Sequence, residues 1–372
     1  MELKNSRGLF FAQTREPQIS YWANPKMLKL VEGSRRTIPS EFLNWNPCAP
    51  DSRSNCPQLH STMEMLVNLS NPKWRDRASN IYAGRIYSNE DVAEAQTNLR
   101  GGMIAISNEY SSAITAYAAM YGRFVSAIDF AAGITQEQSR LLWTGLHDHF
   151  NKSIEDFKRG GIISLKGNDL MVFPDDEARS SFESAIFMAE FWTVAHEFSH
   201  HIVRDVSTRR DREVVTILRD LTKASSVGAE IRAMSSDQRD EINADLLATL
   251  LVSGYFNDTR DPIGVPGSIS GAALSLITIA HFRDEWTCDP EDSHPGCLDR
   301  IRILLTLICE YYGSESAYPG DSERSHIVVR RVAGLLITFA LWVHGSIGMD
   351  SKSINNSIAT LSVIFEFMEN ED

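Results

Sequence analysis

The sequence Ala195-His196-Glu197-Phe198-Ser199-His200 lies inside a longer stretch, from Asp176 to about Val203, that has the hydrophobic pattern of an amphipathic helix. Acidic residues in the first turn of this stretch favour the helix dipole. One apolar stripe runs along it, formed by Phe187, Phe191, Val194, Phe198 and Ile202. The sequence therefore predicts a long helix whose apolar side is buried in the core.

His196 and His200 are four residues apart and so share one face of this predicted helix. They can offer imidazole nitrogens to one metal ion at about 2.0 to 2.1 Å. Glu197 lies about 100° around the helix from His196, where it is too strained to be a third ligand but can take a proton from water on the metal. The alternative is a surface helix that carries these three residues by chance.

A catalytic zinc ion usually has three protein ligands, so a third donor is expected elsewhere in the chain. Val206, six residues after His200, excludes a third His at that position. A second predicted helix, Asp237 to Tyr255, carries Glu241 and Asp245 four residues apart on one face. We predict that Glu241 binds zinc and that Asp245 accepts a hydrogen bond from the other nitrogen of a zinc-bound His.

The acidic residues of this second helix have another interpretation. With Asp237 and Asp240, they could form a solvated N-terminal turn that favours the helix dipole. Asp245 argues against this interpretation because it lies in an apolar stretch, residues 244–252, where an unpaired carboxylate would be costly to bury. Glu230 and Asp240 remain alternative metal ligands.

The chain resembles the gluzincin metallopeptidases, whose motifs are H-E-x-x-H, then E-x-x-A-D, then a Ser/Thr-His-Pro segment followed by Arg. Here the motifs read His196 to His200, Glu241-Ile242-Asn243-Ala244-Asp245, and Ser293-His294-Pro295-Gly296-Cys297-Leu298-Asp299-Arg300. The resemblance implies that His294 helps bind the substrate or the oxyanion, and that Arg300 supports it or pairs with a carboxylate. By its residues alone, the segment at His294 could be only a turn before a helix.

Among these peptidases the chain is similar to the soluble Lit-type phage-exclusion proteases, which are related to the prenyl-protein and heat-shock membrane proteases. The resemblance covers roughly Gly102 to Leu305 and departs from the family between Asp205 and Asp237. It implies a zinc-dependent endopeptidase that hydrolyses a peptide bond in a protein substrate, in phage defence or in control of a host protein.

The alternative function is a catalytically inactive, zinc-stabilised protein-interaction module. The intact Glu197 argues against it, because a structural zinc site has no use for a base and usually fills its fourth position.

The fold class indicated is mainly α (α+β), with a zincin-like helical core and a small sheet or hairpin before the H-E-x-x-H helix. Residues 1–100 show no sustained periodicity, and we expect a wrapping or recognition segment there, beside a metallopeptidase domain at 101–372. Residues 102–106 predict a strand, and residues 162–173 predict a hairpin whose edge at Leu170 to Phe173 could bind an extended substrate. Further helices are expected at 110–128, 268–286, 297–312, 326–343 and 353–368.

The net charge of -13, from 36 Lys and Arg against 49 Asp and Glu, disfavours nucleic acid and anionic membrane surfaces as partners. The N-terminus lacks an apolar stretch long enough for a secretory signal, which favours a cytoplasmic protein. Two apolar stretches, Ile269 to Ala280 and Val332 to Val343, are shorter than the roughly 20 residues that a bilayer needs, so we interpret them as buried core helices.

The five cysteines lack the C-x-x-C spacing of many zinc sites, and we expect reduced thiols without a metal. Pairs such as Cys48 with Cys56, or Cys288 with Cys297, could close a disulfide only in an oxidising compartment.

Overall fold

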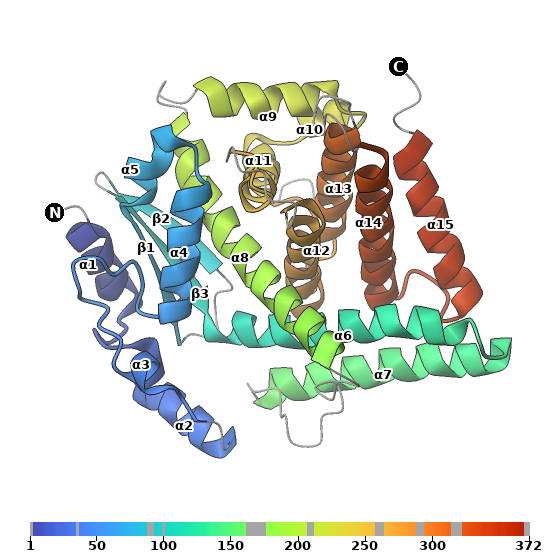
Figure 1. Ribbon diagram of the computed structural model, residues 1–372, viewed down its shortest axis with the longest axis horizontal. Helices are drawn as coiled ribbons and strands as arrows, with labels where there is room; N and C mark the ends of the chain where they lie inside the picture. Colours follow the sequence, from blue (N-terminus) through green and yellow to red (C-terminus); the bar gives the residue numbers. More distant parts are fainter. Residues whose placement is uncertain are drawn as a thin grey trace.

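The computed structural model of the chain describes residues 3–34, 37–87, 93–98, 101–160, 176–206, 212–256, 264–287, 294–313 and 322–367. It is mainly helical with a small sheet (Figure 1), as the sequence predicts. The N-terminal elements are α1 (Leu3–Thr14), α2 (Pro25–Ser34), α3 (Ser40–Leu43), α4 (Pro57–Leu69), α5 (Arg75–Ala78), β1 (Ile81–Ile86), β2 (Ala93–Asn98) and β3 (Gly101–Ser107). They are followed by α6 (Asn108–Ala131), α7 (Gln136–Gly160), α8 (Asp176–Val206), α9 (Arg212–Ala224), α10 (Gly228–Ala233), α11 (Ser236–Val252), α12 (Gly264–Arg283), α13 (Cys297–Gly313), α14 (Ser322–His344) and α15 (Ser351–Phe367).

The sheet has the strand order β1-β3-β2, with β3 parallel to β1 and antiparallel to β2. One face is covered by α1, whose Phe10 and Phe11 pack on Tyr82 and Met103. The other face lies against α4 and α8. Because β1 and β2 precede residue 100 and β3 follows it, one sheet joins the N-terminal segment to the rest of the chain.

The helix that carries the H-E-x-x-H pattern, α8, runs diagonally through the middle of the molecule (Figure 1). It packs on α6, α11 and α12 as well as on β2 and β3. Its predicted apolar stripe is buried from Phe191 onward, but Phe187 is 43% exposed and stacks on the ring of Phe191. The burial of this helix on nearly every side leaves little room for it to shift.

The strand at 102–106 and the helices predicted after it are confirmed, with ends that differ by a few residues. The hairpin predicted at 162–173 lies outside the described residues. Among residues 1–100, the helices α1 to α5 form where the sequence has no sustained period. Two of them, α3 and α5, are only four residues long, which is too short for a helical period to be visible.

Among the described residues, two helices are long and apolar enough to cross a membrane by length and composition, namely α12 and residues Ile327–His344 of α14. In α12, 67% of the most apolar stretch of the helix is buried inside the protein, where the helix packs between α8, α13 and α14. That burial agrees with the interpretation as a core helix. No disulfide joins Cys48, Cys56, Cys297 and Cys309 to one another in the described part of the chain, and Cys288 lies outside it.

Where α8 and α12 cross, small residues bring the two backbones into contact. A Cβ atom added to Gly271 of α12 would lie 2.4 Å from the carbonyl oxygen of Met188 in α8. One turn further along, Ser275 donates a hydrogen bond of 2.9 Å to the carbonyl oxygen of Ala189. The crossing therefore depends on the absence of a side chain at residue 271.

We predict that Gly271→Ala lowers the free energy of unfolding by roughly 1 to 3 kcal/mol, because the added methyl group forces two packed backbones apart. Gly145→Ala is the matched control, since Gly145 lies in α7 and a Cβ atom added there would meet nothing within 4 Å. There the substitution should stabilise the protein by up to about 1 kcal/mol through helix propensity. Denaturant unfolding measures both, and equal effects in the two variants would contradict the close crossing.

Candidate metal centre

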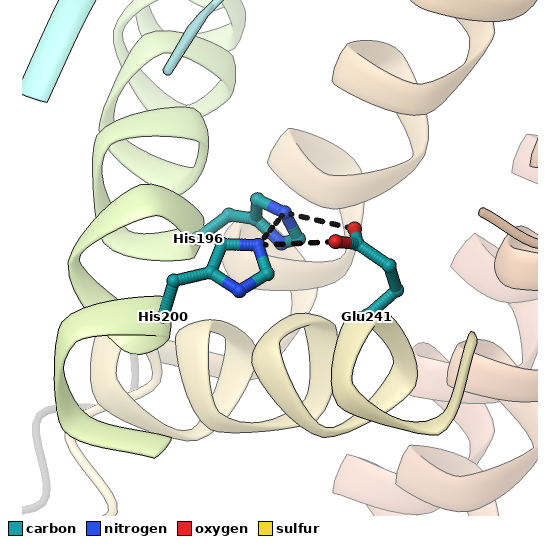
Figure 2. A group of neighbouring side chains, drawn as sticks. All are labelled: His196, His200 and Glu241. Atoms are coloured by element: carbon teal, nitrogen blue, oxygen red, sulfur yellow. Dashed lines mark hydrogen bonds and ion pairs between the residues drawn. The ribbon is translucent and has the colours of Figure 1, made fainter. Parts of the chain in front are cut away.

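Three side chains from two helices bring donor atoms to one place (Figure 2). His196 and His200 extend from α8, and their Nε2 atoms are 3.1 Å apart. Glu241 extends from α11, with one carboxylate oxygen 3.4 Å from Nε2 of His196 and the other 3.3 Å from Nε2 of His200. The three side chains are only 9 to 12% exposed. The three side chains predicted as ligands thus lie together, largely buried, between α8 and α11.

These three side chains could hold a metal ion such as zinc. Donor atoms about 2.0 to 2.1 Å from a tetrahedral zinc lie about 3.3 to 3.4 Å from one another. The two Nε2 atoms are 3.1 Å apart, and the two oxygens of the Glu241 carboxylate lie one 3.4 Å from His196 and the other 3.3 Å from His200. With one donor atom taken from each residue, all three lie within 4.8 Å of one another. Two imidazoles and one carboxylate are also a donor set that zinc accepts in catalytic sites.

The start of α11 explains how Glu241 comes to face α8. Ser235 and Gln238 form a capping box, in which each side chain bonds the backbone N–H of the other residue. The helix begins at this cap, and its residues from Ile242 to Val252 are almost all buried against α8, α12 and α13. Glu241 and Asp245, one turn apart, both face α8 as predicted.

Asp245 holds the second nitrogen of His196. Nδ1 of His196 lies 2.9 Å from Oδ1 of Asp245, although the ring N–H is not aligned well enough with this oxygen for a hydrogen bond. Arg300 of α13 donates two hydrogen bonds to the same carboxylate, of 2.9 Å from Nε and 2.7 Å from Nη2. Its Nη2 also lies 3.5 Å from Glu241. Arg300 therefore pairs with both carboxylates behind the imidazoles.

This network sets the charges of the site. Burial alone would raise the pKa of Asp245, but Arg300 and His196 hold it below its usual range. The pKa of Glu241 is likewise lowered, because His196 and Arg300 outweigh the effect of burial. Burial alone would lower the pKa of His196, but Asp245 and Glu241 raise it to about 10. A metal ion would therefore compete with a proton for this ring.

Glu197 differs from the other carboxyl groups of the site because burial dominates its titration. Burial raises the pKa of Glu197 to about 7, with His196 opposing and Glu241 adding to the rise. Glu94, on β2, contributes in the same direction, and β2 packs against the helix that carries Glu197. A carboxyl group with a pKa near neutrality can both accept and release a proton.

His294 lies at the mouth of the site. Its side chain is 61% exposed, and its Nε2 lies 3.4 Å from Oε1 of Glu241. The third predicted motif therefore joins the first two in space, with His294 on the solvent side of Glu241 and Arg300 on the buried side. Of the alternative ligands, Glu230 forms an ion pair with Arg302, and Asp240 does not belong to the donor group found among the described residues.

Two residues next to the donors in α8, one in contact with His196 and one with the sheet, were not predicted from the sequence. Trp192 stacks on the ring of His196, with ring centroids 5.4 Å apart, and its indole N–H donates to Thr249 of α11. Its position four residues before His196 was a signal for this contact. His201 bonds to the carbonyl oxygen of Met103 in β3, and no local pattern links residues so distant in the sequence.

Comparisons with protein-family models, with curated proteins and with solved structures found no match to this chain. The function of the protein must therefore be inferred from the chemistry of the site.

We predict that Arg300→Ala lowers the free energy of unfolding by roughly 3 to 5 kcal/mol, because it leaves the buried carboxylate of Asp245 without its guanidinium partner. Arg302→Ala is the control on the same helix. Its guanidinium is 42% exposed and pairs with the equally exposed Glu230, so its loss should cost only about 0 to 1 kcal/mol. Denaturant unfolding compares the two, and similar losses would argue against the buried pair.

Proposed function

We propose that this protein is a zinc-dependent endopeptidase of the gluzincin type, which hydrolyses a peptide bond in a protein substrate. The observation that carries the proposal is the donor group His196, His200 and Glu241, with Glu197 following directly after the first ligand. A purely structural site would have no use for this buried carboxyl group. Its elevated pKa fits a general base.

A zinc ion held by the three donors would act as a Lewis acid on the attacking water and on the substrate carbonyl. Glu197 takes a proton from the water as it attacks the carbonyl carbon, and then returns that proton to the leaving amine. His294, at the mouth of the site, donates a hydrogen bond to the carbonyl oxygen as negative charge develops there. Asp245 and Arg300 keep the ring of His196 in its orientation.

The substrate binds in extended form along β2. This strand pairs with β3 on one side only, and no other strand in the described part of the chain pairs with its outer edge. Free backbone groups at such an edge can form a ladder with an added strand. β2 also packs against α8, and Glu94 of this strand influences Glu197. A peptide paired with β2 would therefore pass close to the base.

The partner of this enzyme is a protein or peptide, because the net charge of -13 disfavours nucleic acid and anionic membrane surfaces. Control of a host protein in the cytoplasm, as in phage exclusion, is the biological role that the resemblance indicates.

We predict that Glu197→Gln abolishes hydrolysis, with turnover reduced by at least about 100-fold, because the amide cannot accept the proton of the attacking water. The variant should keep its zinc content and its unfolding temperature, since Gln has nearly the same shape. N-terminal proteomics on cells that express the native chain or the variant measures the effect. A new cleavage product made only by the native chain would identify the substrate.

Turnover by Glu197→Gln equal to that of the native chain would remove the proposed mechanism. Stoichiometric zinc without a cleavage product in either protein would favour the zinc-stabilised interaction module.

We predict that His200→Ala lowers zinc affinity by at least about 10-fold, because one of the three protein donors is lost. His344→Ala is the control, since His344 is exposed at the end of α14 and its ring contacts Trp286 rather than the donor group. Zinc content after competition with a chelator, measured by mass spectrometry, separates the two. Retention of zinc by His200→Ala at the level of His344→Ala would contradict the ligand set.

A further inference from the structure

The residue after the second imidazole donor points to the sheet rather than to the metal centre. His201 is 4% exposed, and its Nε2 lies 3.1 Å from the carbonyl oxygen of Met103 in β3. A carbonyl oxygen can only accept, so Nε2 of His201 carries the hydrogen and donates it. Because consecutive helical residues point about 100° apart, this bond holds one side of α8 while His200 faces α11 on another.

The contact requires a glycine in β3. A Cβ atom at Gly102 would lie 2.3 Å from Cε1 and 2.5 Å from Nδ1 of His201, closer than any real side chain permits. Gly102 does not have a positive φ, so its backbone is one that other residues can adopt. The glycine is therefore needed for the space that it leaves to the imidazole ring.

A second polar contact attaches α8 to the sheet on the other side of the donors. Glu190, six residues before His196, accepts two hydrogen bonds of 3.0 and 2.8 Å from Arg85 of β1. The segment from His196 to His200 thus lies between two attachments to the sheet, and His201 is the nearer one. Side-chain atoms of a helix lie about 5 to 6 Å from its axis, so a rotation of only about 10° would move the donor nitrogens by roughly 1 Å.

We propose that His201 is a positioning residue of the metal centre. Its hydrogen bond to Met103 fixes the rotation of α8 about its own axis, and so sets the direction of the two imidazoles toward Glu241. A metal site tolerates ligand displacements of only about 0.2 Å, which is less than a small rotation of the helix produces. The role rests on the proposed function, because it presupposes that the three donors hold a metal ion.

The test uses Co²⁺ as a probe in the full-length chain, because its visible absorption spectrum reports coordination geometry. His201→Leu removes the donor at similar volume, and Gly102→Ala pushes the ring away while leaving His201 intact. Both should lower Co²⁺ affinity about tenfold, the lower end of what loss of an outer partner costs a metal site. Both should also change the spectrum.

Two further variants separate positioning from general stability. His201→Gln places an amide N–H near the position of Nε2 and should restore the native spectrum. Thr193→Val removes a buried hydroxyl of α8 that lies 2.9 Å from the hydroxyl of Tyr110, so it should lower the unfolding temperature without changing the spectrum. If His201→Leu does not fold, Gly102→Ala and His201→Gln carry the test.

A native spectrum and native Co²⁺ affinity in both His201→Leu and Gly102→Ala would overturn the positioning role alone. The same would follow if Thr193→Val changed the spectrum as much as they do. Failure of the native chain to bind Co²⁺ or Zn²⁺ would overturn the proposed function, and the positioning role with it.

Discussion

The geometry of the candidate metal centre depends on the buried ion pair between Arg300 and Asp245. A carboxylate and a guanidinium taken out of water are stable only when each has its partner in good geometry, and here two hydrogen bonds join them. The pair links α13 to α11, and the contact of Asp245 with His196 extends it to α8. Three helices must therefore adopt one relative position before the charges of the site are compensated.

Two other contacts of α8 require a glycine in the neighbouring element. Gly271 of α12 allows one helix backbone to touch the other, and Gly102 of β3 allows the ring of His201 to lie on the strand. Such contacts have no flexible atoms with which to absorb a displacement. The site is thus assembled by specific charge pairs on one side and by steric limits on the other.

The sequence predicted the parts of the site that follow from the geometry of one helix. Residues four apart on a helix share a face, so the pairing of His196 with His200 and of Glu241 with Asp245 could be read directly. The contact between His201 and Met103 spans 98 residues and has no local pattern. β1 was missed because all its residues are buried, so it lacks the alternation that marks a half-buried strand.

The position of β3 between β1 and β2 has a consequence for the first hundred residues. Exchange of the first hundred residues with those of another gene would leave β3 without a neighbour on either edge, and unpaired strands of this kind promote aggregation. The first hundred residues are therefore part of the fold that supports the donor group, although the donor residues all lie beyond them. A change in that segment keeps β3 paired on both edges only if it leaves the strands β1 and β2 in place.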